Sequence, residues 1–217
     1  MFVGHYAACL AAKKFEKKVS LGVLFLAVQF LDILFFPFVL LGWERINIVE
    51  RYTASTHFEL EYMPYSHSLL AALLWSGAAY ALFRWVVVKH KTVALFVGLA
   101  VFSHWILDLV VHVPDLPLWS DTSIKLGFGL WNYPVVTFTL EAVLLLSALW
   151  LYLRSTSATT ALGKYGMPVY VVLLILLNIG NIFGPVGDPD KTNLAIFALA
   201  AYFLFAGIAF WLDRKRV

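Results

Sequence analysis

The chain has 217 residues, of which 62% are hydrophobic and only 13% are charged, and its mean hydropathy is +0.83. Soluble domains are about half apolar and about a quarter charged, so this composition indicates an integral membrane protein. The net charge of +3 is too small and too dispersed to favour a nucleic-acid partner, and the single cysteine, Cys9, excludes an internal disulfide.

The apolar stretches have the length of helices rather than of alternating strands, so we expect an all-α, polytopic membrane helix bundle of about seven helices. In chain order they span residues 2–12, 20–42, 64–88, 92–113, 134–153, 167–183 and 194–212, within one integral membrane domain, 1–217. The first segment is short for a full span. Its apolar residues precede a lysine cluster, which is the reverse of the order in a signal peptide. Pro37 is expected to kink the second helix.

Ionisable residues interrupt most of these apolar segments. In chain order they are His5, Asp32, His67, His104, Asp108, His112 and Glu141. An ionisable side chain inside a membrane helix costs free energy, and by default it marks a functional site. His104, Asp108 and His112 recur every four residues, so on a helix they share one face, about 6 Å apart along the axis.

The basic residues are unevenly distributed among the connecting segments. Alternate connections, 13–18, 84–91, 154–164 and 214–216, hold most of the 16 lysine and arginine residues. By the positive-inside rule these connections lie in the cytoplasm, which gives an N-out, C-in topology.

Counting residues from the basic connections gives the depth of each polar group. Four groups fall at one level, about 20 Å from the cytoplasmic boundary: Asp32, His104, Glu141 and Asn178. Asp108 and His67 lie one turn further out. His112 and His5 lie near the outer surface, where His112 could also be an ordinary solvated histidine. The alignment predicts a polar chamber that opens towards the outside.

A buried carboxyl also has an interpretation without catalysis. Asp32 or Glu141 could be protonated and hydrogen-bonded between helices. Burying several ionisable groups together has a cost that favours a shared cause, so we expect His67, His104 and Asp108 to act together.

Imidazoles and carboxylates without cysteine suit a catalytic zinc site, with manganese or iron as alternatives. Such an ion lowers the pKa of a bound water and polarises an ester or phosphoryl oxygen. Glu141 is then a candidate general base, and Asp108 a second catalytic candidate. A serine hydrolase is disfavoured, because Ser66 and His67 on a helix would point about 100° apart.

Four short segments resemble the motifs of the bacterial family of predicted membrane-bound metal-dependent hydrolases, which includes a LexA-regulated inner-membrane protein. They are Gly4-His5, Gln29-Phe30-Leu31-Asp32, Tyr65-Ser66-His67-Ser68 and Ser103-His104-Trp105-Ile106-Leu107-Asp108. Ser66 stands where the family has threonine, and Met63 where members often have another histidine. The resemblance implies a metal-dependent hydrolase in a bacterial inner membrane.

The order of these ligands is also similar to that of zinc-dependent phospholipase C. This similarity implies that one ion is held by four residues: Asp32, His67, His104 and Asp108. It also implies that His5 shares Asp108 around a second ion, and that His112 and Glu141 hold a third. The substrate would then be a membrane lipid or a lipid-linked phosphoester, reached from the periplasmic side.

Two other functions use the same residue types. A proton- or cation-coupled transporter also places Asp, His and Glu inside the membrane, but no polar group continues the predicted chamber into the inner half. A structural metal in a non-catalytic protein is the other alternative.

Overall fold

Eight α-helices make up most of the computed structural model, which describes residues 1–217. They are α1 (His5–Phe15), α2 (Leu21–Val28), α3 (Phe30–Leu40), α4 (Leu69–Leu82), α5 (Lys91–Val111), α6 (Pro134–Ser155), α7 (Ala161–Phe183) and α8 (Lys191–Asp213). Five helical segments are long and apolar enough to cross a membrane: α5, α6, α7, α8, and α4 together with the π-helix Phe83–Val87 that continues it. The bent α2–α3 pair is a sixth if it counts as one span. The expected all-α membrane bundle is confirmed.

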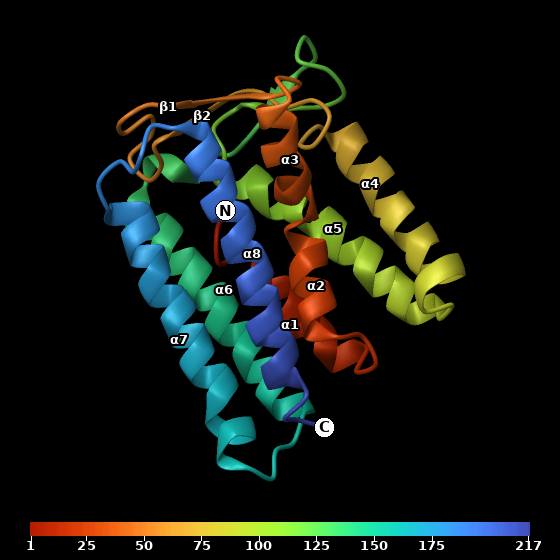
Figure 1. The fold of residues 1–217 in the computed structure, drawn as a ribbon. Coiled ribbons are helices and arrows are strands. Elements are labelled where there is room, and N and C mark those ends of the chain that lie inside the picture. Colours follow the sequence, from red (N-terminus) through yellow and green to blue (C-terminus); the bar gives the residue numbers. More distant parts are fainter.

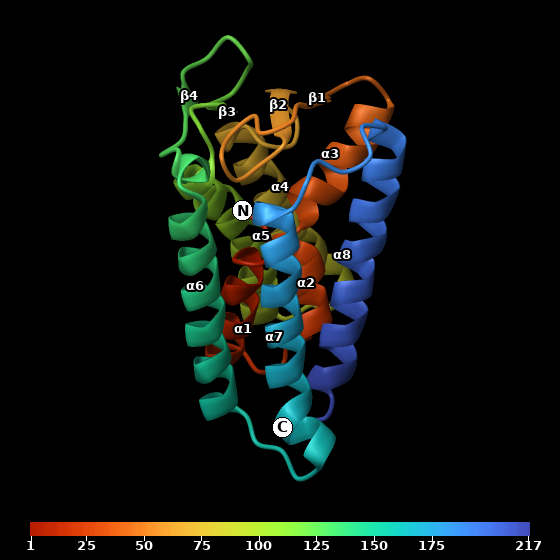
Figure 2. The ribbon, with the colours of Figure 1, turned by 90° about the vertical axis from the view of Figure 1, so that its left-hand side faces the viewer.

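The short first helix lies inside the bundle rather than across it. α1 packs against α6, α2 and α5, and Figure 2 shows it enclosed behind the long helices α6 and α7. At 1.5 Å per residue its 11 residues extend only about 16 Å. The first residue of α1, His5, therefore lies in the protein interior.

One end of the bundle carries the irregular connections. β1 (Arg45–Ile48) and β2 (Phe58–Tyr62) form an antiparallel hairpin, and β3 (Leu116–Pro117) pairs with β4 (Lys125–Leu126). Both lie at the top of Figure 1, and we call this the hairpin end. The opposite end, near the C-terminus, carries the basic connections 13–18, 84–91, 154–164 and 214–216, and we call it the basic end.

Two of the differences between the predicted and the observed helices affect the position of the polar residues. The second segment breaks at Gln29, where α2 and α3 meet at 48°, and not at Pro37, which lies inside α3. The third helix begins at Leu69 rather than at residue 64, because Ser68 caps it by accepting a hydrogen bond from the amide of Ala71. His67 therefore lies in a turn that precedes α4, which gives its side chain a direction that a helix would not.

Candidate metal centre

His104 and Asp108 on α5 form the middle of a buried polar cluster. His104 Nε2 lies 2.9 Å from Asp108 Oδ2, as expected for residues one helical turn apart. The other carboxylate oxygen, Oδ1, lies 3.1 Å from His5 Nε2 on α1 and 2.6 Å from the amino nitrogen of Met1. Asp108 thus joins α5 to the internal helix α1.

Asp32 and His67 approach the cluster from the other side. The start of α3 directs Asp32 inward, and its Oδ1 lies 3.2 Å from His67 Nε2 and 3.7 Å from His104 Nε2. His67 Nε2 is also 3.9 Å from Asp108 Oδ2. Five of the predicted ligands therefore meet in one place, although they come from four separate segments of the chain.

The side chains form two groups that share His104. His5, His104 and Asp108 form one, and Asp32, His67 and His104 form the other; within each, the candidate ligand atoms lie within 4.8 Å of one another. Zinc binds nitrogen and oxygen ligands at about 2.0–2.2 Å, so either group is close to the geometry of a metal site.

The Nδ1 atoms of two histidines are each held by an acceptor on the side away from the cluster. Nδ1 of His104 lies 2.7 Å from the carbonyl oxygen of Val28, and Nδ1 of His112 lies 2.8 Å from the carboxylate of Asp115. Both oxygens accept only, so each Nδ1 carries the proton and each Nε2 keeps a free lone pair. Metal-binding histidines are commonly oriented in this way.

His67 is oriented by a chain of two residues. Ser66 Oγ donates to Glu44 Oε2 at 2.6 Å and lies 2.7 Å from His67 Nδ1. Because the hydroxyl has already given its proton to Glu44, Nδ1 of His67 donates to it and Nε2 faces the cluster. Glu44 also accepts the amides of Tyr65 and Ser66, so it fixes the whole turn.

Glu44 lies in the connection between α3 and β1, and the sequence gives no signal that links it to Ser66, 22 positions later. The structure also corrects the expected divergence of Ser66 and His67, since they lie in a turn and not on a helix. Burial raises the pKa of Glu44, and the hydrogen bonds from Ser66 oppose this shift.

Two aromatic residues complete the support. The hydroxyl of Tyr202 on α8 donates to Asp32 Oδ2 at 2.9 Å, which leaves Oδ1 for the cluster. The indole of Trp105 donates to the carbonyl of His67 at 2.9 Å and holds the same turn that Glu44 holds. The sequence does not indicate a supporting role for either residue, because an aromatic residue in an apolar helix gives no signal of its own.

Glu141 and His112 lie beside the cluster but belong to neither group. Glu141 Oε2 accepts the amides of Phe2 and Gly4, so it anchors the start of α1. His112 Nε2 is 3.7 Å from Asp108 Oδ1. Asn178 is buried, and its side-chain oxygen bonds only to Asn181.

Several inward-facing atoms are buried without a hydrogen-bond partner. Both ring nitrogens of His5 and Nε2 of His104 are among them, and the two rings stack with centroids 3.9 Å apart. Buried polar atoms are rarely left unpaired, because each one costs free energy. Free imidazole lone pairs beside two carboxylates are a donor set that fits a divalent cation.

A cavity of about 130 Å³ adjoins the cluster on the side of the hairpin end. Asp32, His67 and Asp108 line it, together with Thr56 and Phe58 of the hairpin region. Comparisons with the models of known families, with curated proteins and with solved structures find no match for this chain.

Proposed function

We propose that this protein is a membrane-embedded metal-dependent hydrolase that cleaves a lipid or lipid-linked phosphoester. The observation that carries the proposal is the convergence of five ligand side chains in two groups that share His104. Supporting contacts on Asp32, His67 and His104 leave their other ligand atoms facing the cluster. His5, Asp32, His67, His104 and Asp108 would hold the metal. We propose zinc, with manganese or iron as alternatives, because the donors are imidazoles and carboxylates without thiolate.

When bound, the ion would activate a water and polarise the scissile phosphoryl or ester oxygen. The residues of the chain would position the ligands and accept the proton. Asp108 belongs to one group and lies 3.9 Å from His67 of the other, so it would fix the spacing of the ligands. Glu141 lines the same cavity and, as a carboxylate close to the cluster, would take the proton of the attacking water.

The substrate class follows from the surroundings of the cluster. The small cavity shares three lining residues, Thr56, Phe58 and Asn181, with a second cavity of about 260 Å³ between the outer ends of α7 and α8. The second cavity is lined by polar groups, including His57 and Asp188, and by the apolar Phe197. A polar head group attached to a membrane-bound tail suits this combination.

A hydrolase fits these surroundings better than a transporter does. Towards the basic end, the helices α1 and α5 that carry the cluster are packed with buried apolar side chains such as Leu10, Val97 and Val101. A proton or cation pathway needs polar groups along its whole length. The chamber is therefore best explained as a reaction site with one entrance.

The distribution of basic residues favours a cytoplasmic basic end, which would direct the hairpin end outwards. Together with the resemblance to the membrane-bound hydrolases, this supports the inner membrane of a bacterium, with the site on the periplasmic side.

The proposal is tested with protein stripped by a chelator and reconstituted with zinc, manganese or iron. Phospholipids and lipid-linked phosphates are then screened for released phosphate or alcohol. We expect activity that requires metal and that His104→Ala abolishes. His90→Asn is the matched control, because it removes an imidazole at the basic end but keeps a side chain that can cap α5. Equal hydrolysis by the metal-free protein would contradict the proposal.

A further inference from the structure

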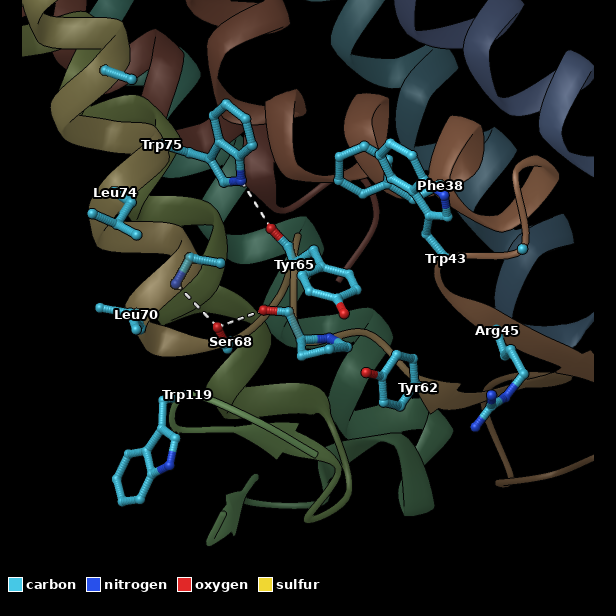
Figure 3. A pocket seen from close by; sticks show the side chains of 14 residues that line it. Phe38, Trp43, Arg45, Tyr62, Tyr65, Ser68, Leu70, Leu74, Trp75 and Trp119 are labelled. Atoms are coloured by element: carbon cyan, nitrogen blue, oxygen red, sulfur yellow. Dashed lines mark hydrogen bonds between the residues drawn. The ribbon is translucent and has the colours of Figure 1, made fainter. Parts of the chain in front are cut away.

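A large groove lies on the opposite side of the turn that carries His67. Figure 3 shows it between α4 and the segment that joins α3 to the hairpin, with Trp75 and Leu74 on one side and Phe38 and Trp43 on the other. Its volume is about 1020 Å³. It exists because α4 packs against α5 and diverges from α3, as Figure 1 shows.

The groove continues deeper along α4. A second cavity of about 550 Å³, between α4 and the α2–α3 pair, is lined by hydrophobic residues alone. The two cavities share the lining residues Trp75 and Ala78, so they adjoin one another along α4. We call the two cavities together the α4 groove. It runs from the hairpin end towards the middle of the bundle.

The mouth of the α4 groove is polar and aromatic. The guanidinium of Arg45 lies over the Tyr62 ring, 4.8 Å from its centre, and is 3.3 Å from Glu61 Oε1. The indoles of Trp43 and Trp119 also line the mouth and are exposed. Tryptophan and tyrosine favour the level of lipid head groups, which places this mouth at a membrane surface.

We propose that the α4 groove binds one glycerophospholipid molecule, with its phosphate at Arg45 and an acyl chain that passes Trp75 into the deep cavity. The charge at the mouth and the wholly apolar depth match the two ends of such a molecule. Arginine suits phosphate because its planar fork donates two parallel hydrogen bonds. Glu61, beside Arg45, suits the ammonium group of a zwitterionic head group such as phosphoethanolamine.

This site is separate from the metal centre. The α4 groove and the cavity beside the cluster share no lining residue. Tyr65 and Ser68 form part of the groove wall, and His67 lies between them in sequence but lines the other cavity. The bound lipid would therefore support the turn that carries His67 from the side that faces away from the metal centre, whether or not the protein is a hydrolase.

The test is native mass spectrometry of the full chain released from nanodiscs that contain equal amounts of phosphatidylethanolamine and diacylglycerol. We expect the wild type to retain one phosphatidylethanolamine and little diacylglycerol. Arg45→Gln removes a half-exposed side chain and should reduce retention about tenfold, a loss of roughly 1.4 kcal/mol.

Ala78→Trp places a bulky side chain at the point where the two cavities adjoin and should abolish retention of phosphatidylethanolamine. Leu73→Trp is its control, because Leu73 is exposed on the same helix but lines neither cavity. Equal retention in wild type and Arg45→Gln, or equal retention of diacylglycerol and phosphatidylethanolamine, would overturn the proposal. So would equal losses in the two tryptophan variants.

Discussion

The bundle buries two polar clusters, one near each end, and they differ in how well their atoms are satisfied. At the basic end, Lys13 Nζ donates to the carbonyls of Lys17 and Val19 and to Asp213 Oδ2, each at 2.9 Å. Asp213 also accepts the amide of Leu21 and the hydroxyl of Tyr152. Here every donor meets an acceptor and each charge meets its opposite.

The metal centre contains an excess of acceptors instead. Two carboxylates and several imidazole lone pairs converge. The ring nitrogens of His5 and Nε2 of His104 have no hydrogen-bond partner, although Nε2 of each lies within 3.1 Å of an Asp108 oxygen. A satisfied buried network stabilises the fold on its own, whereas an unsatisfied one needs a further group. The comparison therefore assigns the basic-end cluster to structure and the other cluster to a ligand.

The largest effect on stability should come from the basic-end cluster. Lys13→Met leaves the carboxylate of Asp213 buried without its counter-charge, which should lower the free energy of unfolding by about 3–5 kcal/mol. Denaturation in micelles measures this loss. The variant should still bind metal, and a variant of normal stability that lost its metal would reverse the two assignments.

Metal binding should stabilise the protein through the other cluster. Zinc at 100 times its Kd should add about 2.7 kcal/mol to the free energy of unfolding, because it binds the folded state only. Asp108→Asn should remove this gain and Lys13→Met should keep it. The same denaturation assay with and without zinc distinguishes them, and a gain that persists in Asp108→Asn would place the ion elsewhere.

The support around His67 should matter less than the ligands. Glu44→Gln keeps the shape of the side chain but replaces one carboxylate oxygen with an amide group that donates. The variant therefore loses the acceptor either for the Ser66 hydroxyl or for the backbone amides. Loss of such a support typically weakens metal binding about 10- to 100-fold. Calorimetric titration would measure it, with Glu50→Gln as the control, since Glu50 is exposed beyond the other end of β1. Equal affinities in the two variants would show that Glu44 acts only on the fold.

The smallest effect should come from Tyr202→Phe. This change removes one hydrogen bond to Asp32, worth about 1 kcal/mol, and should weaken metal binding roughly fivefold. Tyr170→Phe deletes a hydroxyl that bonds to the carbonyl of Phe205, away from the cluster, and should leave the affinity unchanged. A larger effect in Tyr170→Phe would mean that the titration reports packing rather than ligation.

The ligands could be predicted from the sequence because membrane helices make ionisable residues conspicuous. His104 and Asp108 lie one turn apart on a regular helix, so their pairing follows from spacing alone. Counting from the basic connections also brought Asp32 and His67 to nearly the same depth, and the structure confirms that they meet.

The supporting residues could not be predicted, because irregular backbone decides them. An apolar run gave no sign of a break at Gln29, whereas Pro37 suggested one in the wrong place. The turn that carries His67 depends on Glu44, which reaches it only because the hairpin folds back over the bundle. Such long-range contacts have no periodic signal in the chain.

The most direct test of the account is the metal content of the purified protein, measured by mass spectrometry of the elements. The wild type, His104→Ala, Asp108→Asn and Lys13→Met are compared after equilibration with zinc and removal of the excess. We predict at least about one equivalent in the wild type and Lys13→Met, and almost none in the two ligand variants. Equal metal content in all four proteins, or none in any, would contradict the claim that this cluster is a metal site.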